Sequence, residues 1–250
     1  MPIDLAPVAY APLIARVIDR VFPEFMMAVR ERGGRDLVGR YGGPPAAGYL
    51  VEFRTKLWPA GASVTAGQFA AVCRYRDLEA AREGLHRHAE HGTLTLHEDG
   101  TFEATDRGRE LLRELFALHG EVARRFWAAF PTARLNELAE RALHSVTAGP
   151  SLSAMTPCSY PTSTPTEAVL VNTLGTLRYH RADAHAAAWQ AEGLTADQIK
   201  AMPLDGADAG GVRTHIEEQT DRGAAAAWVA LTEAERLEFL AGLGALPCNG

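Results

Sequence analysis

The alternation of apolar and polar positions predicts a chain built mainly from helices. Apolar residues recur at helical spacing over 12–32, although Pro23 is expected to break or kink that helix. The same spacing predicts a long helix over 106–126 and further helices over 132–146, 168–190, 212–228 and 232–243. The predicted fold class is therefore mainly α.

Three segments lack this helical pattern. Residues 33–48 are rich in Gly and Pro and predict a loop, whereas 49–58 fit a strand and a helix equally well. Residues 147–167 are rich in Ser, Thr and Pro, which is typical of a connection between domains. The sequence therefore predicts two domains, 1–150 and 151–250.

A winged helix-turn-helix is predicted in the middle of the chain. Its elements are two short helices, a β-hairpin and a long helix, at 65–74, 77–91, 93–105 and 106–126. Asp99-Gly100 suits the hairpin turn, and Thr105 suits the N-cap of the long helix. The small hairpin forms the wing, and a helical domain follows at the C-terminal end.

The helix predicted over 168–190 combines an apolar stripe with a high density of charge. The stripe contains Leu170, Leu174, Leu177, Ala184 and Ala188. Five charged or titratable residues fall within eight positions, namely Arg178, His180, Arg181, Asp183 and His185. A buried charge without a partner is costly, so those beside the stripe are expected to meet internal partners or to line a cavity.

His180 and Asp183 are the candidate catalytic residues. They are three positions apart, on the side of the helix that also carries Thr173 and Thr176. A carboxylate at that spacing can orient an imidazole and raise its basicity for general acid–base chemistry. The alternative is a hydrogen-bonded pair on the protein surface.

The remaining polar residues of this helix are candidate ligand-binding residues. Arg178, Arg181 and His185 face the other way and could clamp a carboxylate, phosphate or sulfate. A structural alternative is an ion pair between Arg181 and Glu217, because buried charges are usually paired. Both interpretations remain open at the level of sequence.

The charge distribution argues against DNA as a partner. Lys and Arg number 25 and Asp and Glu number 31, which gives a net charge of −6. The predicted recognition helix, 77–91, carries four acidic residues against two Arg, and the wing tip is His97-Glu98-Asp99. DNA binding relies on cationic contacts to phosphate, so it is disfavoured. Four Arg remain for such contacts, namely Arg74, Arg76, Arg107 and Arg109.

No cofactor or metal is predicted. His86, His88 and His91 do not share one helical face, and the three cysteines have no zinc or disulfide spacing. A Gly-rich phosphate loop and a nucleophile elbow are both missing, and Cys158 has no neighbour that would stabilise a thiolate. The chain has neither a secretory signal nor a membrane-spanning run, and a cytoplasmic protein is expected.

Two parts of the chain resemble known families. ATDRGRELL, at 104–112, resembles the point in MarR-type regulators where the wing passes into the long helix. LRYHRADAHAAAW, IEEQTDR and LTEAERLEFLAGLGALP resemble an actinobacterial helix-turn-helix family of uncertain function. The second resemblance covers the five polar residues of 178–185 together with Glu217, Thr220 and Arg222. The MarR resemblance implies a homodimer formed through the long helix, or pairing with a related protein.

Two functions remain open. In the first, the winged helix is a scaffold and the chain is an enzyme of specialised metabolism that acts on a small anionic substrate. His180 and Asp183 would supply acid–base chemistry, and substrate binding would use Arg178, Arg181, His185, Glu217 and Arg222. In the second, the chain is a MarR-like, ligand-responsive, DNA-binding regulator. The acidic recognition helix favours the first.

Overall fold

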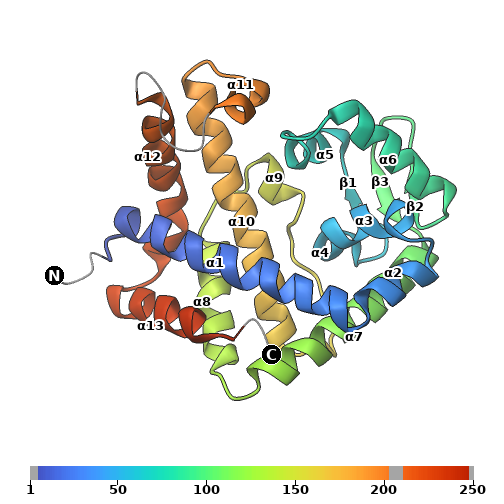
Figure 1. Ribbon diagram of the computed structural model, residues 1–250, viewed down its shortest axis with the longest axis horizontal. Coiled ribbons are helices and arrows are strands. Elements are labelled where there is room, and N and C mark those ends of the chain that lie inside the picture. The colour runs from blue at the N-terminus through green and yellow to red at the C-terminus, as the bar shows by residue number, and fades with distance from the viewer. Residues whose placement is uncertain (1–4, 203–210, 248–250) are drawn as a thin grey trace.

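The computed structural model describes residues 5–202 and 211–247, and within them the chain is mainly helical (Figure 1). This confirms that the fold is mainly α, whereas the winged helix-turn-helix stays a prediction. The α-helices are α1 (Pro7–Val29), α2 (Arg35–Arg40), α3 (Pro44–Glu52), α4 (Arg54–Leu57), α5 (Ala66–Val72), α6 (Leu78–Glu90), α7 (Asp106–Trp127), α8 (Thr132–His144), α9 (Pro150–Ser153), α10 (Thr166–Ala191), α11 (Ala196–Ala201), α12 (Val212–Ala224) and α13 (Glu233–Ala245). A kink at Arg30–Gly34, with non-helical backbone angles at Arg32 and Gly33, joins α1 to α2, and a 3-10 segment, Ala225–Ala230, follows α12.

One small antiparallel sheet accompanies α5, α6 and α7. Its strands are β1 (Ser63–Val64), β2 (Leu94–Leu96) and β3 (Phe102–Ala104), in the spatial order β1-β3-β2. Leu94 lies opposite Ala104, so the predicted hairpin is confirmed, and Gly100 adopts the positive φ of 79° that its turn requires. Strand β1 was not predicted, because two residues are too few to display an alternating pattern.

The predicted helix starts were mostly correct. Thr105 caps α7 through the N–H of Gly108, as predicted. Thr195 and Thr232, each followed three residues later by Gln or Glu, form capping boxes at the starts of α11 and α13. The sequence of 206–211, with three Gly in six residues, predicts a flexible link, but this segment falls almost wholly outside the described residues, as does Cys248.

Pro23 was expected to break or kink the first helix, and the helix does not break there. Helix α1 continues through Pro12 and Pro23 as far as Val29. Its inner face is buried along the whole length, at Ile14, Ile18 and Phe25 among others. Packing of that face offsets the backbone hydrogen bond that an internal proline removes.

The predicted loop over 33–48 was also wrong. Helix α2 and the start of α3 lie within it, and the ambiguous segment 49–58 is helical. Gly33 and Gly43 have positive φ angles of 115° and 80°. These two glycines therefore serve abrupt turns between short helices, and their presence does not indicate one extended loop.

Helix α10 lies at the centre of the molecule (Figure 1). It crosses α1 and packs on α8 and α12 on one side, while α9 separates it from α5. A large hydrophobic core combines residues of α1, α7 and α8 with residues of α10 and α13, and a second core surrounds the sheet. Residues on both sides of position 150 thus share the larger core, and the domain boundary at that position stays a prediction.

Residues 170–177 of α10 are all buried, which corrects the expectation of a polar face there. Asn172, Thr173 and Thr176 are buried. Each of them donates a hydrogen bond to the backbone carbonyl four residues earlier in the helix. Local backbone bonding thus satisfies these polar groups without solvent. Across residues 5–202 and 211–247, no helix is both long and apolar enough to cross a membrane.

Candidate functional site

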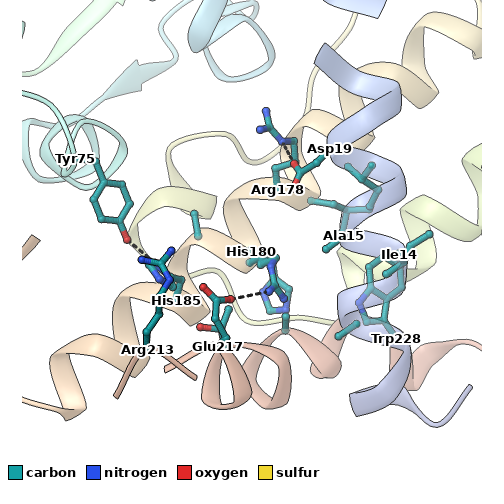
Figure 2. Close-up of a pocket in the computed structure, with 17 residues that line it drawn as sticks. Ile14, Ala15, Asp19, Tyr75, Arg178, His180, His185, Arg213, Glu217 and Trp228 are labelled. Carbon is teal, nitrogen blue, oxygen red and sulfur yellow. Dashed lines mark hydrogen bonds and ion pairs between the residues drawn. The ribbon is translucent and has the colours of Figure 1, made fainter. Parts of the chain in front are cut away.

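A cavity of about 360 Å³ lies between α1, α10 and α12 (Figure 2). Its apolar wall comes mainly from α1 and from the segment after α12, and includes Ile14, Ala15, Ile18 and Trp228. Its polar wall comes mainly from α10 and α12, and includes His180, Arg181, His185, Arg213 and Glu217. A cavity divided in this way suits a ligand that has an apolar body and a polar head.

The spacing along α10 explains why several of its polar residues reach the cavity. Leu177, Arg181 and His185 are four positions apart and therefore follow one another along one face of the helix. Arg178 and His180 also line the cavity. The sequence motif thus marks a real concentration of polar groups beside an internal space.

Arg181 is neutralised within the protein. Its Nη1 lies 2.6 Å from Asp221 Oδ1, and its Nη2 lies 3.4 Å from Glu217 Oε2. The predicted Arg181–Glu217 ion pair is therefore confirmed, and the stronger contact to Asp221 was not anticipated. With both partners on α12, Arg181 fixes α12 against α10.

Arg178 and Arg222 occupy more exposed positions. Arg178 Nε donates to Asp19 Oδ1 of α1 at 2.8 Å, and its guanidinium lies over the ring of Phe22. Arg222 is on α12 and forms an exposed ion pair with Glu218, 3.6 Å away. Arg222 does not line the cavity, so the predicted set of ligand-binding residues comes together only in part.

Asp183 does not orient His180, contrary to the sequence-based expectation. Its carboxylate accepts the backbone N–H groups of Ser151 and Leu152, both at 2.9 Å, and forms an ion pair with Arg74 at 2.9 Å. The first two bonds cap α9, and the third holds the connection between α5 and α6. The three-residue spacing suggested the wrong partner for Asp183, because the groups that its carboxylate contacts are distant in sequence.

His180 carries a buried ring nitrogen without a hydrogen bond. Its Nε2 has no partner within the part of the chain that the structure describes. Burial lowers the pKa of His180, while the Ala224 backbone and the charge of Asp183 act in the opposite direction. The imidazole is consequently neutral near pH 7 and lies in the wall of the cavity.

His185 belongs to a hydrogen-bonded chain with two aromatic residues. Trp189 Nε1 donates to the Tyr75 hydroxyl at 3.0 Å, and that hydroxyl lies 2.7 Å from His185 Nδ1 (Figure 2). The indole can only donate, so the Tyr75 hydroxyl oxygen accepts from it, whereas the direction of the bond between the hydroxyl and Nδ1 follows the tautomer of His185.

Burial also affects the pKa of His185. It lowers the pKa of this histidine, against an opposing effect from Glu217. Tyr75 and Arg74 lie between α5 and α6 and were not recognised as site residues from sequence. Only the tertiary fold brings that connection to α10.

Within residues 5–202 and 211–247, no three His, Cys, Asp or Glu side chains form a group that could hold a metal ion. No model of a known protein family matches the chain, and no curated protein or solved structure shows significant similarity to it. The resemblances to MarR-type regulators and to the actinobacterial family therefore rest on the quoted sequence segments.

Proposed function

We propose that the chain binds a small organic anion in the cavity between α1, α10 and α12. The observation that carries the proposal is the pairing of an apolar wall with a wall of guanidinium and imidazole groups. Arg178, Arg181 and Arg213 line this cavity, against the carboxylates of Asp19 and Glu217. An aryl or alicyclic carboxylate has the matching chemistry, with its ring against Trp228 and its charge toward the guanidinium groups.

In this proposal the chain is an enzyme of specialised metabolism, and His180 is its acid–base residue. Its lowered pKa keeps the imidazole unprotonated near neutrality, which is the state that a general base requires. Its Nε2 has no acceptor or donor among the described residues and is thus available to a bound molecule after a small local rearrangement. Asp183 contributes only indirectly, by holding α9 and the α5–α6 connection.

The proposal treats residues 63–127 as a winged-helix scaffold. Support comes from the element order, with α5 and α6 followed by the hairpin and α7, and from β1 joining that hairpin. The exposed face of α6 mixes acidic and basic residues, namely Glu79, Arg82, Glu83, His86, Arg87 and Glu90. Such a face offers a DNA backbone little net attraction.

The four arginines that could contact DNA phosphates each interact with another group of the protein. Arg74 pairs with Asp183, and Arg76 lies 3.6 Å from the Glu52 carboxylate. Arg109 bonds to Asp106 and to a backbone carbonyl, and Arg107 lies over the ring of Tyr41. These contacts favour the enzyme over the alternative, a MarR-like regulator that would use the same cavity for its effector.

Titration calorimetry with benzoate and with benzyl alcohol tests the proposal. The two probes share a ring and differ in charge, so the protein is expected to bind benzoate more tightly. Ala15→Phe fills the cavity from α1 and should abolish this binding. Ala187→Phe, at an exposed position of α10 that does not line the cavity, is the matched control and should keep it.

Two results would overturn the proposal. One is equal affinity for benzyl alcohol and benzoate, because the guanidinium groups would then play no part. The other is unchanged benzoate binding by a folded Ala15→Phe variant, because the ligand would then occupy another place.

A further inference from the structure

A second cavity, of about 320 Å³, is lined by residues of α1, α3, α4 and α10. Three guanidinium groups line it, those of Arg54, Arg76 and Arg178, together with one carboxylate, that of Glu52. Arg178 is the one residue found in the linings of both cavities among the described residues. The second cavity is thus a separate and more strongly cationic space.

Arg54 is the unusual member of this set. Its side chain is buried, with 6% of the residue exposed. Its Nε donates to Asn172 Oδ1 at 2.6 Å, and its Nη1 donates to the Val51 carbonyl at 2.7 Å. Both of these hydrogen-bond acceptors are neutral. Within the described residues, no carboxylate forms an ion pair with Arg54 and no acceptor binds its Nη2.

Glu52, the acidic residue nearest to Arg54 in sequence, interacts with other side chains. The Glu52 carboxylate accepts a hydrogen bond from the Tyr179 hydroxyl and lies 3.6 Å from Arg76. It affects Arg54 only through space. A second through-space contact is the ring of Phe22, which the Arg54 guanidinium faces at 5.8 Å.

A bound anion would stabilise the buried guanidinium of Arg54. Burial lowers the pKa of Arg54, yet an arginine keeps its proton at any physiological pH. A buried charge without an ionic partner is strongly unfavourable, and a bound anion would remove that cost. The free Nη2 and the neighbouring Arg76 provide donors for two oxygens of such an anion.

We propose that this second cavity binds the oxyanion group of a small polar metabolite, with Arg54 as the central cation. Thr55 and Thr176 line the same space, and their hydroxyl oxygens, whose protons go to backbone carbonyls, can accept hydrogen bonds from a hydroxylated or amidated body. The proposal is independent of the proposed function, since the two cavities take different ligands. Phosphate monoesters and carboxylates share the required head group.

Calorimetry with inorganic phosphate and with succinate, at constant ionic strength maintained with chloride, tests the proposal. The wild-type protein should bind at least one of the two, and the preferred probe identifies the head group. Arg54→Met should weaken that binding about ten- to a hundredfold, the effect of losing a charge-assisted contact. Arg87→Met, on the exposed face of α6, is the matched control and should bind as the wild type does.

Asn172→Asp provides a second test should Arg54→Met fail to fold. The substitution places a carboxylate oxygen where Oδ1 now accepts from Arg54 Nε, so the charge is compensated from within. Binding of phosphate or succinate should weaken, while binding of benzoate in the first cavity should not change. The proposal is overturned if wild-type protein binds neither probe, or if folded variants at both positions bind as tightly as the wild type.

Discussion

The guanidinium of Arg74 lies 2.9 Å from the carboxylate of Asp183, and their side chains are only 13% and 11% exposed. This ion pair joins the α5–α6 connection to α10, at positions 109 residues apart. Because the same carboxylate also accepts two N–H groups of α9, a single side chain holds three elements together. Asp183 is therefore a structural residue in the first instance.

Asp183→Asn should destabilise the fold by about 3 kcal/mol, because it leaves the Arg74 charge largely buried without a counter-charge. Urea denaturation monitored by circular dichroism measures the change. Asp19→Asn is the control, since Asp19 pairs with Arg178 at an exposed position and its loss should cost less than about 1 kcal/mol. An unchanged unfolding midpoint for Asp183→Asn would refute the structural role.

Gly108→Ala should destabilise the protein by about 1–3 kcal/mol, since a Cβ there would lie 2.2 Å from the Thr93 carbonyl oxygen. The comparison is Gly39→Ala in α2, where a Cβ meets nothing within 4 Å. The higher helix propensity of Ala should raise the free energy of unfolding there by as much as about 1 kcal/mol. Thermal unfolding of the two variants should therefore shift in opposite directions. A stabilised Gly108→Ala would mean that α7 does not approach the Thr93 backbone so closely.

Stability should decrease as the pH falls below about 6.5, where the histidines of the unfolded chain take up protons. Burial lowers the pKa of His88 to about 4 and that of His119 well below its usual value, so the folded protein resists protonation. The unfolded state then binds more protons than the folded state. Each such histidine contributes a slope of at most about 1.4 kcal/mol per pH unit.

His119→Leu should reduce this pH dependence and leave stability at pH 7 unchanged or higher. Both ring nitrogens of His119 are buried without hydrogen bonds among the described residues, so an apolar side chain removes an unsatisfied polar group. Denaturation series between about pH 5.5 and 7.5 compare this variant with His86→Leu, at an exposed position. A His119→Leu slope equal to that of wild type would contradict the account.

The protein should not bind its own upstream DNA tightly and specifically, because the exposed face of α6 is mixed in charge and nearby arginines have internal partners. Electrophoretic shifts between about 50 and 200 mM salt measure this binding. Tight binding that weakens on Arg82→Ala would instead identify α6 as a recognition helix and favour the regulator.

Local signals in the sequence predicted much of the fold. Thr105, Thr195 and Thr232 mark helix starts through hydrogen bonds within three residues, and Asp99-Gly100 marks its turn in the same local way. Whether the first helix continues past Pro23 could not be decided locally, because the packing that offsets the cost of this proline involves α10 and α13.

The candidate site was predictable only where its residues lie on one helix. The polar residues of α10 stand out by their density, and Arg181 was paired correctly with Glu217. Asp183 was assigned to His180 because Ser151, Leu152 and Arg74 become neighbours only in the folded chain. Arg54 gave no signal, since the sequence alone does not reveal which of many arginines is buried without a carboxylate.

Arg178 lines both cavities, which allows occupation of one cavity to affect the other. A molecule in either cavity that shifts this side chain changes the charge and the shape of the other. The two occupants would then be thermodynamically linked, each altering the affinity for the second by the same factor. Two ligands of quite different chemistry would in this way change each other's affinity across the width of a single helix.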